Sequence, residues 1–322
     1  MERFDYHRPV MVDEAIEGLH IQPCGTYVDA TFGGGGHSRA IMEHLGPEGH
    51  LVGFDQDEDA AKRVESGEWR AESGEWRVES EAKFTFIHEN FRHLKGFLRL
   101  YGVRQVDGVL ADLGVSSHQF DTAERGFSTR LDGELDLRMD RRGDVTARDL
   151  VNTLDEGELA RLLKLYGELP NARQMARAIV QFRARKAEAG GIRTTTDLKE
   201  AVSRHLPRGM ENKYLAMLFQ ALRIEVNGEL EALREMLQQA TALLPEGGRL
   251  VVISYHSLED RIVKNWMRAG NFDGVVEKDF YGNPLSPLRQ LKSCGASDEE
   301  VAVNSRSRSA RLRVAEKVRE ML

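Results

Sequence analysis

The stretch TYVDATFGGGGHS, residues 26–38, decides the fold of this chain. A short run of β-branched and aromatic residues reaches Asp29, four glycines follow, and a helix-like segment begins at Ser38. This order predicts a strand, a tight loop and a helix. Glycines allow positive φ angles and let a ligand approach the backbone without a Cβ in the way. The stretch therefore predicts the first turn of a nucleotide-binding α/β sheet.

A second acidic residue indicates the kind of ligand. Asp55 follows the apolar run 51–54, about twenty residues after the loop, where a carboxylate can accept hydrogen bonds from ribose hydroxyls. The loop lacks the Gly-Lys-Ser/Thr ending that binds a triphosphate, and Ser38 stands where a dinucleotide fingerprint has its third glycine. S-adenosyl-L-methionine carries no phosphate and needs a helix start near its carboxylate. These features favour that methyl donor over a nicotinamide or flavin cofactor, or over a glycine turn without a ligand.

Composition limits the remaining classes. The 322 residues are enough for one elaborated domain or two, and 41% of them are hydrophobic, as in a globular protein. Cys24 and Cys294 lie far apart without metal-ligand spacing, so we expect neither a disulfide framework nor a metal site. We find no leader-like start and no membrane-length apolar window, which predicts a cytoplasmic protein. The net charge of −7 argues against indiscriminate nucleic-acid binding, so any such contact must be local.

Further strands are predicted over 84–88, 106–112 and 249–256. Phe91 follows the first of these and could stack on an adenine, although core packing explains it equally well. Asp112 ends the second, an apolar run. Because ligands of open α/β sheets bind at the carboxyl ends of strands, we expect Asp29, Asp55 and Asp112 to converge. After the last strand, residues 257–260 predict a capping box, and 280–297 predict a flexible flap.

The strand rhythm stops between residues 121 and 212, which predicts an inserted helical domain. We expect a first core part at 1–120, the insertion at 121–213 and a second core part at 214–322. One predicted helix, 171–186, carries cations and no acid, and two further arginines precede the last strand. In an acidic protein these cations favour RNA phosphate contacts, the alternative being a solvated face. They are Arg173, Arg177, Arg183, Arg185, Lys186, Arg306 and Arg308.

One segment repeats itself. ESGEWR at 65–70 recurs at 72–77, which we interpret as a duplication that lengthens a surface connection.

A series of short motifs runs along nearly the whole chain. They are HRPVM at 7–11, DATFGGGGHS at 29–38, DLGVSS at 112–117, RGFS at 125–128, LRMD at 137–140, FQALR at 219–223 and HSLEDR at 256–261. In this order they resemble the RsmH (MraW) family, the ribosomal RNA small-subunit cytidine N4-methyltransferases.

The resemblance implies a Rossmann-like S-adenosylmethionine-dependent methyltransferase fold with an inserted all-helical domain. It implies cofactor contacts at Gly35, Gly36, His37, Asp55, Phe91, Asp112 and Gln119. The substrate would be the cytidine at position 1402 in the decoding centre of 16S rRNA, in the small ribosomal subunit or its precursor. The oligomeric state stays open, a homodimer included.

Methyl transfer to an exocyclic amine needs no thiolate nucleophile, unlike methylation of carbon 5. Asp112 is the first candidate to orient the amine, and His256 is a weaker candidate to accept its proton. The alternatives are that Asp112 serves the cofactor alone and that His256 is structural. For the whole chain, the alternative is a non-catalytic RNA-binding ribosome-assembly factor that retains a cofactor pocket. A small-molecule methyltransferase is less favoured, because it would not use the basic insertion.

Overall fold

The computed structural model describes residues 9–71 and 80–320, and the chain divides into two compact units. One unit comprises the chain up to Gly114 and from Leu230 onward, and the other runs from Val115 to Glu229. The sequence predicted the insertion over 121–213. The helix that follows residue 210 packs with the helices of the second unit, and its apolar residues belong to that unit's core.

The first unit is built on a seven-stranded sheet in the order β3-β2-β1-β4-β5-β7-β6. Its strands are β1 (Thr26–Asp29), β2 (His50–Phe54), β3 (Lys83–Ile87), β4 (Gly108–Asp112), β5 (Arg249–Ser254), β6 (Leu288–Gly295) and β7 (Arg311–Lys317). Strands β3, β2, β1, β4 and β5 pair in parallel, and β7 pairs antiparallel with both β5 and β6. The order reverses between β1 and β4, so the carboxyl ends of these two strands lie side by side at the switch point where such sheets bind ligands.

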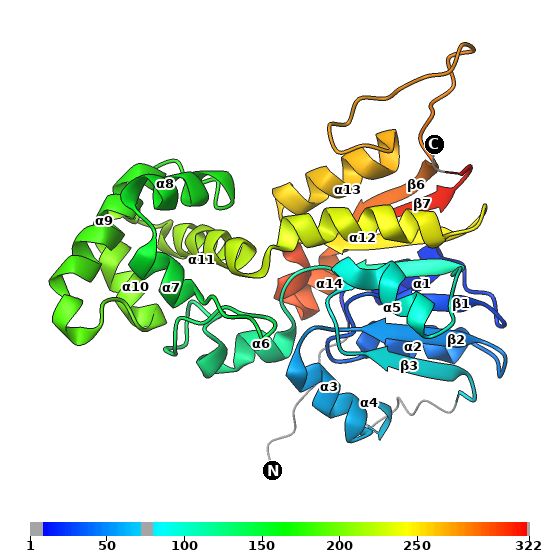
Figure 1. Cartoon of the computed structure of the whole chain (residues 1–322), viewed down its shortest axis with the longest axis horizontal. Coiled ribbons are helices and arrows are strands. Elements are labelled where there is room, and N and C mark those ends of the chain that lie inside the picture. The colour runs from blue at the N-terminus through cyan, green and yellow to red at the C-terminus, as the bar shows by residue number, and fades with distance from the viewer. Residues whose placement is uncertain (1–8, 72–79, 321–322) are drawn as a thin grey trace. The chain divides into compact units, whose positions relative to one another are not determined.

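Helices cover both faces of this sheet. They are α1 (Val12–Leu19), α2 (Gly36–His44), α3 (Glu58–Glu65), α4 (Glu68–Ala71), α5 (Leu94–Leu100), α12 (Glu229–Leu243), α13 (Ser257–Ala269) and α14 (Asp298–Val303), with short 3₁₀ turns η1 (Phe91–His93) and η5 (Ser305–Ser309). Right-handed crossovers place α2 and α3 on one face and α5, α12 and α13 on the other. Figure 1 shows α5, α12 and α13 in front of the sheet.

The sheet is held by apolar strands that are buried on both faces. Val28, Val109 and Val251 are fully buried, as expected for parallel strands between two helical layers. Trp69, in the first copy of the repeated segment, is also buried, with its ring 5.5 Å from Phe32 and 4.3 Å from Phe84 between ring centroids. Trp69 of the first copy is therefore part of the core, whereas Glu65, Ser66 and Glu68 of that copy are exposed; the second copy, 72–77, lies outside the described residues.

The second unit consists of helices in the part of the chain that the structure describes. They are α6 (Ser117–Asp121), α7 (Ala147–Thr153), α8 (Glu156–Leu165), α9 (Ala172–Arg185), α10 (Thr195–Val202) and α11 (Glu211–Asn227), with η2 (Ala123–Arg125), η3 (Ala187–Ala189) and η4 (Ser203–His205). Their apolar stripes meet in one core that includes Leu159, Ile179 and Leu218. The predicted insertion is all-helical, as expected.

Two of the sequence motifs, 125–128 and 137–140, are tied together inside this unit. Arg125 is 1% exposed, and its guanidinium donates to the backbone carbonyls of Arg138 and Met139, each at 3.1 Å. Gly126 has φ +74°, and a Cβ there would lie 2.3 Å from the carbonyl oxygen of Glu134. These motif residues therefore shape the long connection before α7.

Within the described residues, we find no helix with the length and apolar character needed to span a membrane. His7 and Arg8 of the first motif lie outside the described residues.

Candidate active site

The carboxyl edge of the sheet gathers the predicted acids, since Asp29 ends β1, Asp55 follows β2 and Asp112 ends β4. Asp29 is fully buried, and its carboxylate accepts hydrogen bonds from Ser38 Oγ at 2.7 Å and from the backbone N–H of Thr31 at 3.1 Å. The Thr31 hydroxyl in turn accepts from the backbone N–H of Asp112 at 2.7 Å. The glycine loop is thereby connected to the ends of both β1 and β4.

The glycines of the loop are required by the protein's own packing. Gly35 has φ +77° and caps α2, and a Cβ on it would lie 2.8 Å from Phe32 Cζ. A Cβ on Gly36 would lie 2.3 Å from Pro9 Cγ. The loop leaves the first N–H groups of α2 at the carboxyl edge, where a helix start favours a carboxylate such as that of an amino-acid ligand.

Asp55 closes the loop from the second strand. Its Oδ2 accepts from the backbone N–H of Gly33 at 2.6 Å and its Oδ1 from that of Asp57 at 2.8 Å. Burial raises the pKa of Asp55 to about 7, against the effect of these two hydrogen bonds. Each carboxylate oxygen can accept a second hydrogen bond, so the group can still receive ribose hydroxyls. Such donors would also stabilise its ionised form.

His37, the first residue after the loop glycines, is buried and links three segments. Its Nε2 lies 3.0 Å from the carbonyl oxygen of Val10, so this nitrogen carries a hydrogen and donates it to that carbonyl. Its Nδ1 faces Asp112, with 3.7 Å between Nδ1 and Oδ2. A small movement of either side chain would bring the His37 ring within hydrogen-bonding distance of the Asp112 carboxyl group.

Asp112 has a second partner that the sequence did not reveal. The Tyr255 hydroxyl, just after β5, donates to Asp112 Oδ1 at 2.7 Å. Burial raises the pKa of Asp112 to about 6, while His37 and the Tyr255 hydroxyl oppose the shift. A carboxyl group with a pKa near neutrality is suited to proton transfer. No local pattern marks Tyr255, because strand pairing alone places it beside Asp112.

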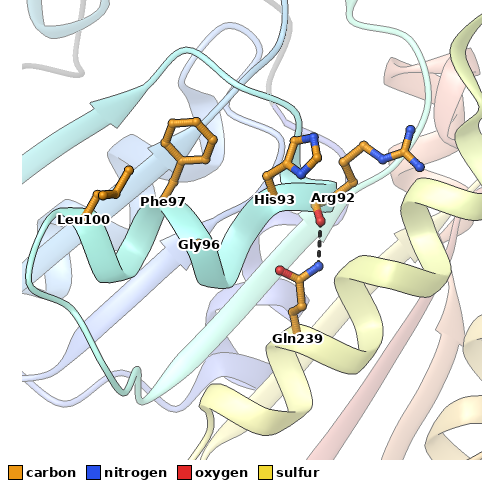
Figure 2. Close-up of a pocket in the computed structure, with 6 residues that line it drawn as sticks. All are labelled: Arg92, His93, Gly96, Phe97, Leu100 and Gln239. Atoms are coloured by element: carbon orange, nitrogen blue, oxygen red, sulfur yellow. Dashed lines mark hydrogen bonds between the residues drawn. The ribbon is translucent and has the colours of Figure 1, made fainter.

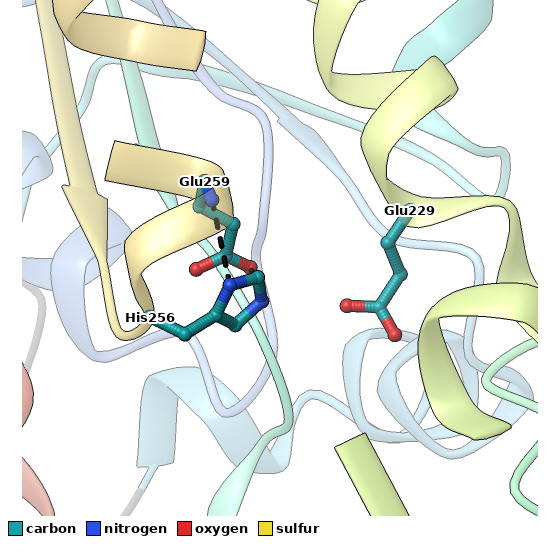
Figure 3. A group of neighbouring side chains, drawn as sticks. All are labelled: Glu229, His256 and Glu259. Atoms are coloured by element: carbon teal, nitrogen blue, oxygen red, sulfur yellow. Dashed lines mark hydrogen bonds and ion pairs between the residues drawn. The ribbon is translucent and has the colours of Figure 1, made fainter. Parts of the chain in front are cut away.

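His256 caps the helix that follows β5. Its Nδ1 accepts from the backbone N–H of Glu259 at 3.4 Å, and its Nε2 lies 3.1 Å from Glu259 Oε1 (Figure 3). The capping box predicted at Ser257 is therefore wrong: the chain stays extended through His256, at φ −141° and ψ 161°, so that residue is the N-cap. The side chain is 10% exposed, and its Nε2 forms no hydrogen bond with the residues that the structure describes, although Glu259 Oε1 lies near it.

The two other predicted cofactor residues lie in different parts of the chain. Phe91 is partly buried at the start of η1, which is fixed by Asn90 through a 2.9 Å bond from the Arg92 N–H. Gln119 is buried in α6 of the helical unit, where it forms a capping box with Ser116.

A pocket of about 490 Å³ lies elsewhere in the first unit, between α5 and α12 (Figure 2). Gln239 closes one side by donating to the Arg92 carbonyl at 2.6 Å. None of the predicted cofactor residues lines it.

The predicted RNA-binding cations differ in exposure. Arg173, Arg177 and Arg185 are exposed on α9, whereas Arg183 donates to the Val151 carbonyl at 2.8 Å and Lys186 to Asp197 at 2.6 Å. Arg306 and Arg308 are exposed in η5. The helix itself carries no acid, but acids of neighbouring helices pair with its cations. One of them, Glu156, pairs with Arg177 at 3.3 Å.

The strand order, the glycine loop after β1 and the acid after β2 define the class as Rossmann-like S-adenosylmethionine-dependent methyltransferases. The sequence profile of the MraW methylase family matches residues 5–318. Ribosomal RNA small subunit methyltransferase H of Phocaeicola vulgatus is 53% identical over 314 residues, 97% of each chain. The protein of that name from Flavobacterium johnsoniae is 49% identical over 98% of each chain.

The chain therefore belongs to the MraW methylase family, and its cofactor is S-adenosyl-L-methionine, which confirms the resemblance found in the sequence. Among solved structures, TrmN from Thermus thermophilus is 13% identical over 96% of this chain and 48% of its own, with a TM-score of 0.41. Family membership thus rests on the sequence matches.

Proposed function

We propose that the protein methylates the exocyclic N4 amine of a cytidine in 16S rRNA, at position 1402 of the decoding centre. The observation that carries the proposal is the Asp112 carboxyl group at the end of β4, held by Tyr255 and facing His37, with a pKa of about 6. The names of the relatives support ribosomal RNA as the substrate class.

The chemistry requires an oriented amine and a proton acceptor. The bound cofactor supplies an electrophilic methyl group on a sulfonium centre. Asp112 accepts a hydrogen bond from the amine and holds the nitrogen in line with that methyl group. Asp112 would then take the proton that the amine gives up when it receives the methyl group. His37 Nδ1, 3.7 Å from Oδ2, is the next acceptor.

His256 is the second candidate for proton acceptance. Its Nδ1 already accepts the capping N–H of Glu259, so a proton on Nδ1 would break the cap of α13. Its Nε2 faces the Glu259 carboxylate, which favours a proton already bound there. Protonation of His256 at Nδ1 would therefore cost the cap of α13, which makes Asp112 the better acceptor.

The two cysteines favour the exocyclic amine over ring carbon 5 as the methylated atom. Attack on the ring needs a thiolate. Burial raises the pKa of the Cys294 thiol, and Cys24 is exposed in the segment before β1, away from the carboxyl edge. Neither cysteine offers an activated nucleophile.

The substrate's phosphates need cations. We propose that the exposed arginines of α9, namely Arg173, Arg177 and Arg185, and those of η5, Arg306 and Arg308, contact phosphates beside the target nucleotide. Arg183 and Lys186 hold α9 to its neighbours. The target base must leave its stack, which costs least in single-stranded or open RNA.

The deciding experiment is transfer of radiolabelled methyl from S-adenosyl-L-methionine to 30S subunits that lack the modification, with nucleoside analysis of the RNA. We expect label in N4-methylcytidine, lost in Asp112→Asn. Cofactor affinity is measured in parallel by calorimetry, which separates lost chemistry from lost binding. Tight cofactor binding without label in any RNA would instead support the non-catalytic assembly factor.

A further inference from the structure

Two aromatic side chains that the proposed function does not use stand almost entirely in solvent. Phe280 is 97% exposed and Tyr281 is 86% exposed, in the segment between α13 and β6. Their rings contact each other edge to face, with centroids 5.6 Å apart. Rings of this size are strongly favoured in contact with other apolar surface, so two neighbouring exposed rings indicate a binding surface.

The rings are presented by an organised turn, although the sequence predicted a flexible flap over 280–297. Asp279 accepts hydrogen bonds from the backbone N–H groups of Tyr281 and Asn283 at 2.9 and 2.8 Å, and from Asn283 Nδ2 at 3.0 Å. Lys278 and Pro284 form a β-bridge across the turn. Because the turn is already formed, a ligand that binds the rings need not order it.

The preceding helix carries a stripe of cations. Arg261, Lys264 and Arg268 are exposed on α13, and their spacing of three and four residues places them on one face. The acids of this helix are used elsewhere, since Glu259 is buried and Asp260 binds Arg313 at 2.7 Å. The stripe is therefore a local positive surface in a protein of net charge −7.

The stripe and the turn are continuous along the chain. α13 starts directly after β5, at the carboxyl edge, and β6 begins at the opposite edge, because both strands pair antiparallel with β7. The three cations span about 10 Å along the helix. Arg268, the last of them, donates to the Gly274 carbonyl at 2.7 Å in the segment that leads to the turn. The surface thus leads from the methyl-transfer edge toward the exposed rings.

We propose that α13 and the turn 278–284 form a second binding surface, for single-stranded RNA that leads away from the target nucleotide. The cations of α13 contact its phosphates, and Phe280 and Tyr281 stack on its bases, the combination by which proteins bind single strands. Asp273 and Glu277 are exposed in the intervening segment, and Lys278 and Asp279 of the turn carry opposite charges, so the turn binds mainly through its rings. The choice of RNA as the ligand rests on the proposed function.

The test uses the full-length protein and two variants. In the first, Phe280→Ser is combined with Tyr281→Ser; in the second, Lys264 is replaced by Ala. Because all three side chains are exposed, folding should be unaffected. The matched controls lie in α5 and at its C-cap: Leu100→Ser with Tyr101→Ser, whose side chains are 79% and 52% exposed, and Lys95→Ala. The measured quantity is Kd for 30S subunits and for protein-free 16S rRNA, at several salt concentrations.

The double variant Phe280→Ser with Tyr281→Ser should raise Kd roughly tenfold and leave the salt dependence of binding unchanged. Lys264→Ala should reduce the slope of log Kd against log salt by about 0.7. Kd values that match wild type, a defect of equal size in the controls, or a defect with 30S subunits but not with protein-free rRNA would each overturn the proposal. Normal RNA binding by a wild-type protein that transfers no methyl group would refute the proposed function alone.

Discussion

The contact between Tyr255 and Asp112 permits a prediction about the pH dependence of methyl transfer. Tyr255→Phe removes one hydroxyl, and with it the 2.7 Å hydrogen bond to Asp112 Oδ1. That bond favours the ionised carboxylate, so its loss should raise the pKa of Asp112 beyond about 6. If the carboxylate must be ionised to accept a proton, activity is lost as the pH falls through this pKa. The acid limb of the rate profile should therefore move to higher pH.

The size of the shift follows from the bond. A hydrogen bond to a charged group contributes about 1.5–3 kcal/mol, and protonated Asp112 would retain part of it. A difference of about 1.4 kcal/mol corresponds to one pH unit, so we expect a shift of about one unit. The groups that also face Asp112 are His37, Asp29 and Glu259, all unchanged in the variant. The plateau rate at high pH should stay near that of wild type.

The assay is kcat for methyl transfer to 30S subunits between about pH 5 and pH 9, with cofactor affinity measured at each pH. Tyr27→Phe is the matched control, because the hydroxyl of this buried side chain also takes part in a 2.7 Å hydrogen bond, which it accepts from the backbone N–H of Gln22. An acid limb that does not move in Tyr255→Phe, or that moves equally in Tyr27→Phe, would refute the assigned role of Tyr255.

Three further predictions concern stability, each measured by urea unfolding of the cofactor-free protein. Gly36→Ala, which places a Cβ 2.3 Å from a neighbouring proline ring, should lower the free energy of unfolding by about 1–3 kcal/mol. Gly96→Ala has open space around it in α5 and should raise that energy by about 0.5–1 kcal/mol; equal effects would contradict the packing argument. Asp55 has a pKa of about 7 against an ordinary 3.8, so the folded state holds a proton that the unfolded chain releases, and stability should fall as the pH rises through that window. Asp55→Asn should remove up to about 1.4 kcal/mol per pH unit of that decline; parallel profiles would count against the shifted pKa. Arg125→Met removes this donor from one buried and one partly buried carbonyl and should lower the free energy of unfolding by about 2–4 kcal/mol, with faster proteolysis of the helical unit; wild-type resistance would show that these two hydrogen bonds are dispensable.

The sequence was most informative for strands whose burial alone determines their hydrophobic pattern. Strands β1 and β4 are buried on both faces and therefore consist of apolar runs, each of which reaches an acid at the edge where ligands bind. β6 was missed because it is the outer strand of the sheet. Most of its residues are exposed, Arg289 and Gln290 among them, and backbone pairing with β7 holds it in place.

The candidate site shows the same limit. Asp55 and Asp112 could be predicted because strand ends mark them, but Tyr255 lies 143 residues from its partner and no spacing rule joins them. The sequence predicted the cap of α13 at Ser257, one residue too late, because the extended backbone after β5 makes His256 the N-cap. Contacts of this kind depend on the assembled sheet and not on local sequence.

The glycine loop has a consequence for how the cofactor arrives. Gly33 is bonded to Asp55, and Thr31 to Asp29, so hydrogen bonds within the protein itself fix the loop. Cofactor binding then needs no slow ordering of the glycine loop. In stopped-flow mixing, the observed rate should rise linearly with cofactor concentration without reaching a plateau. Discrimination between the methyl donor and its demethylated product would lie in their residence times.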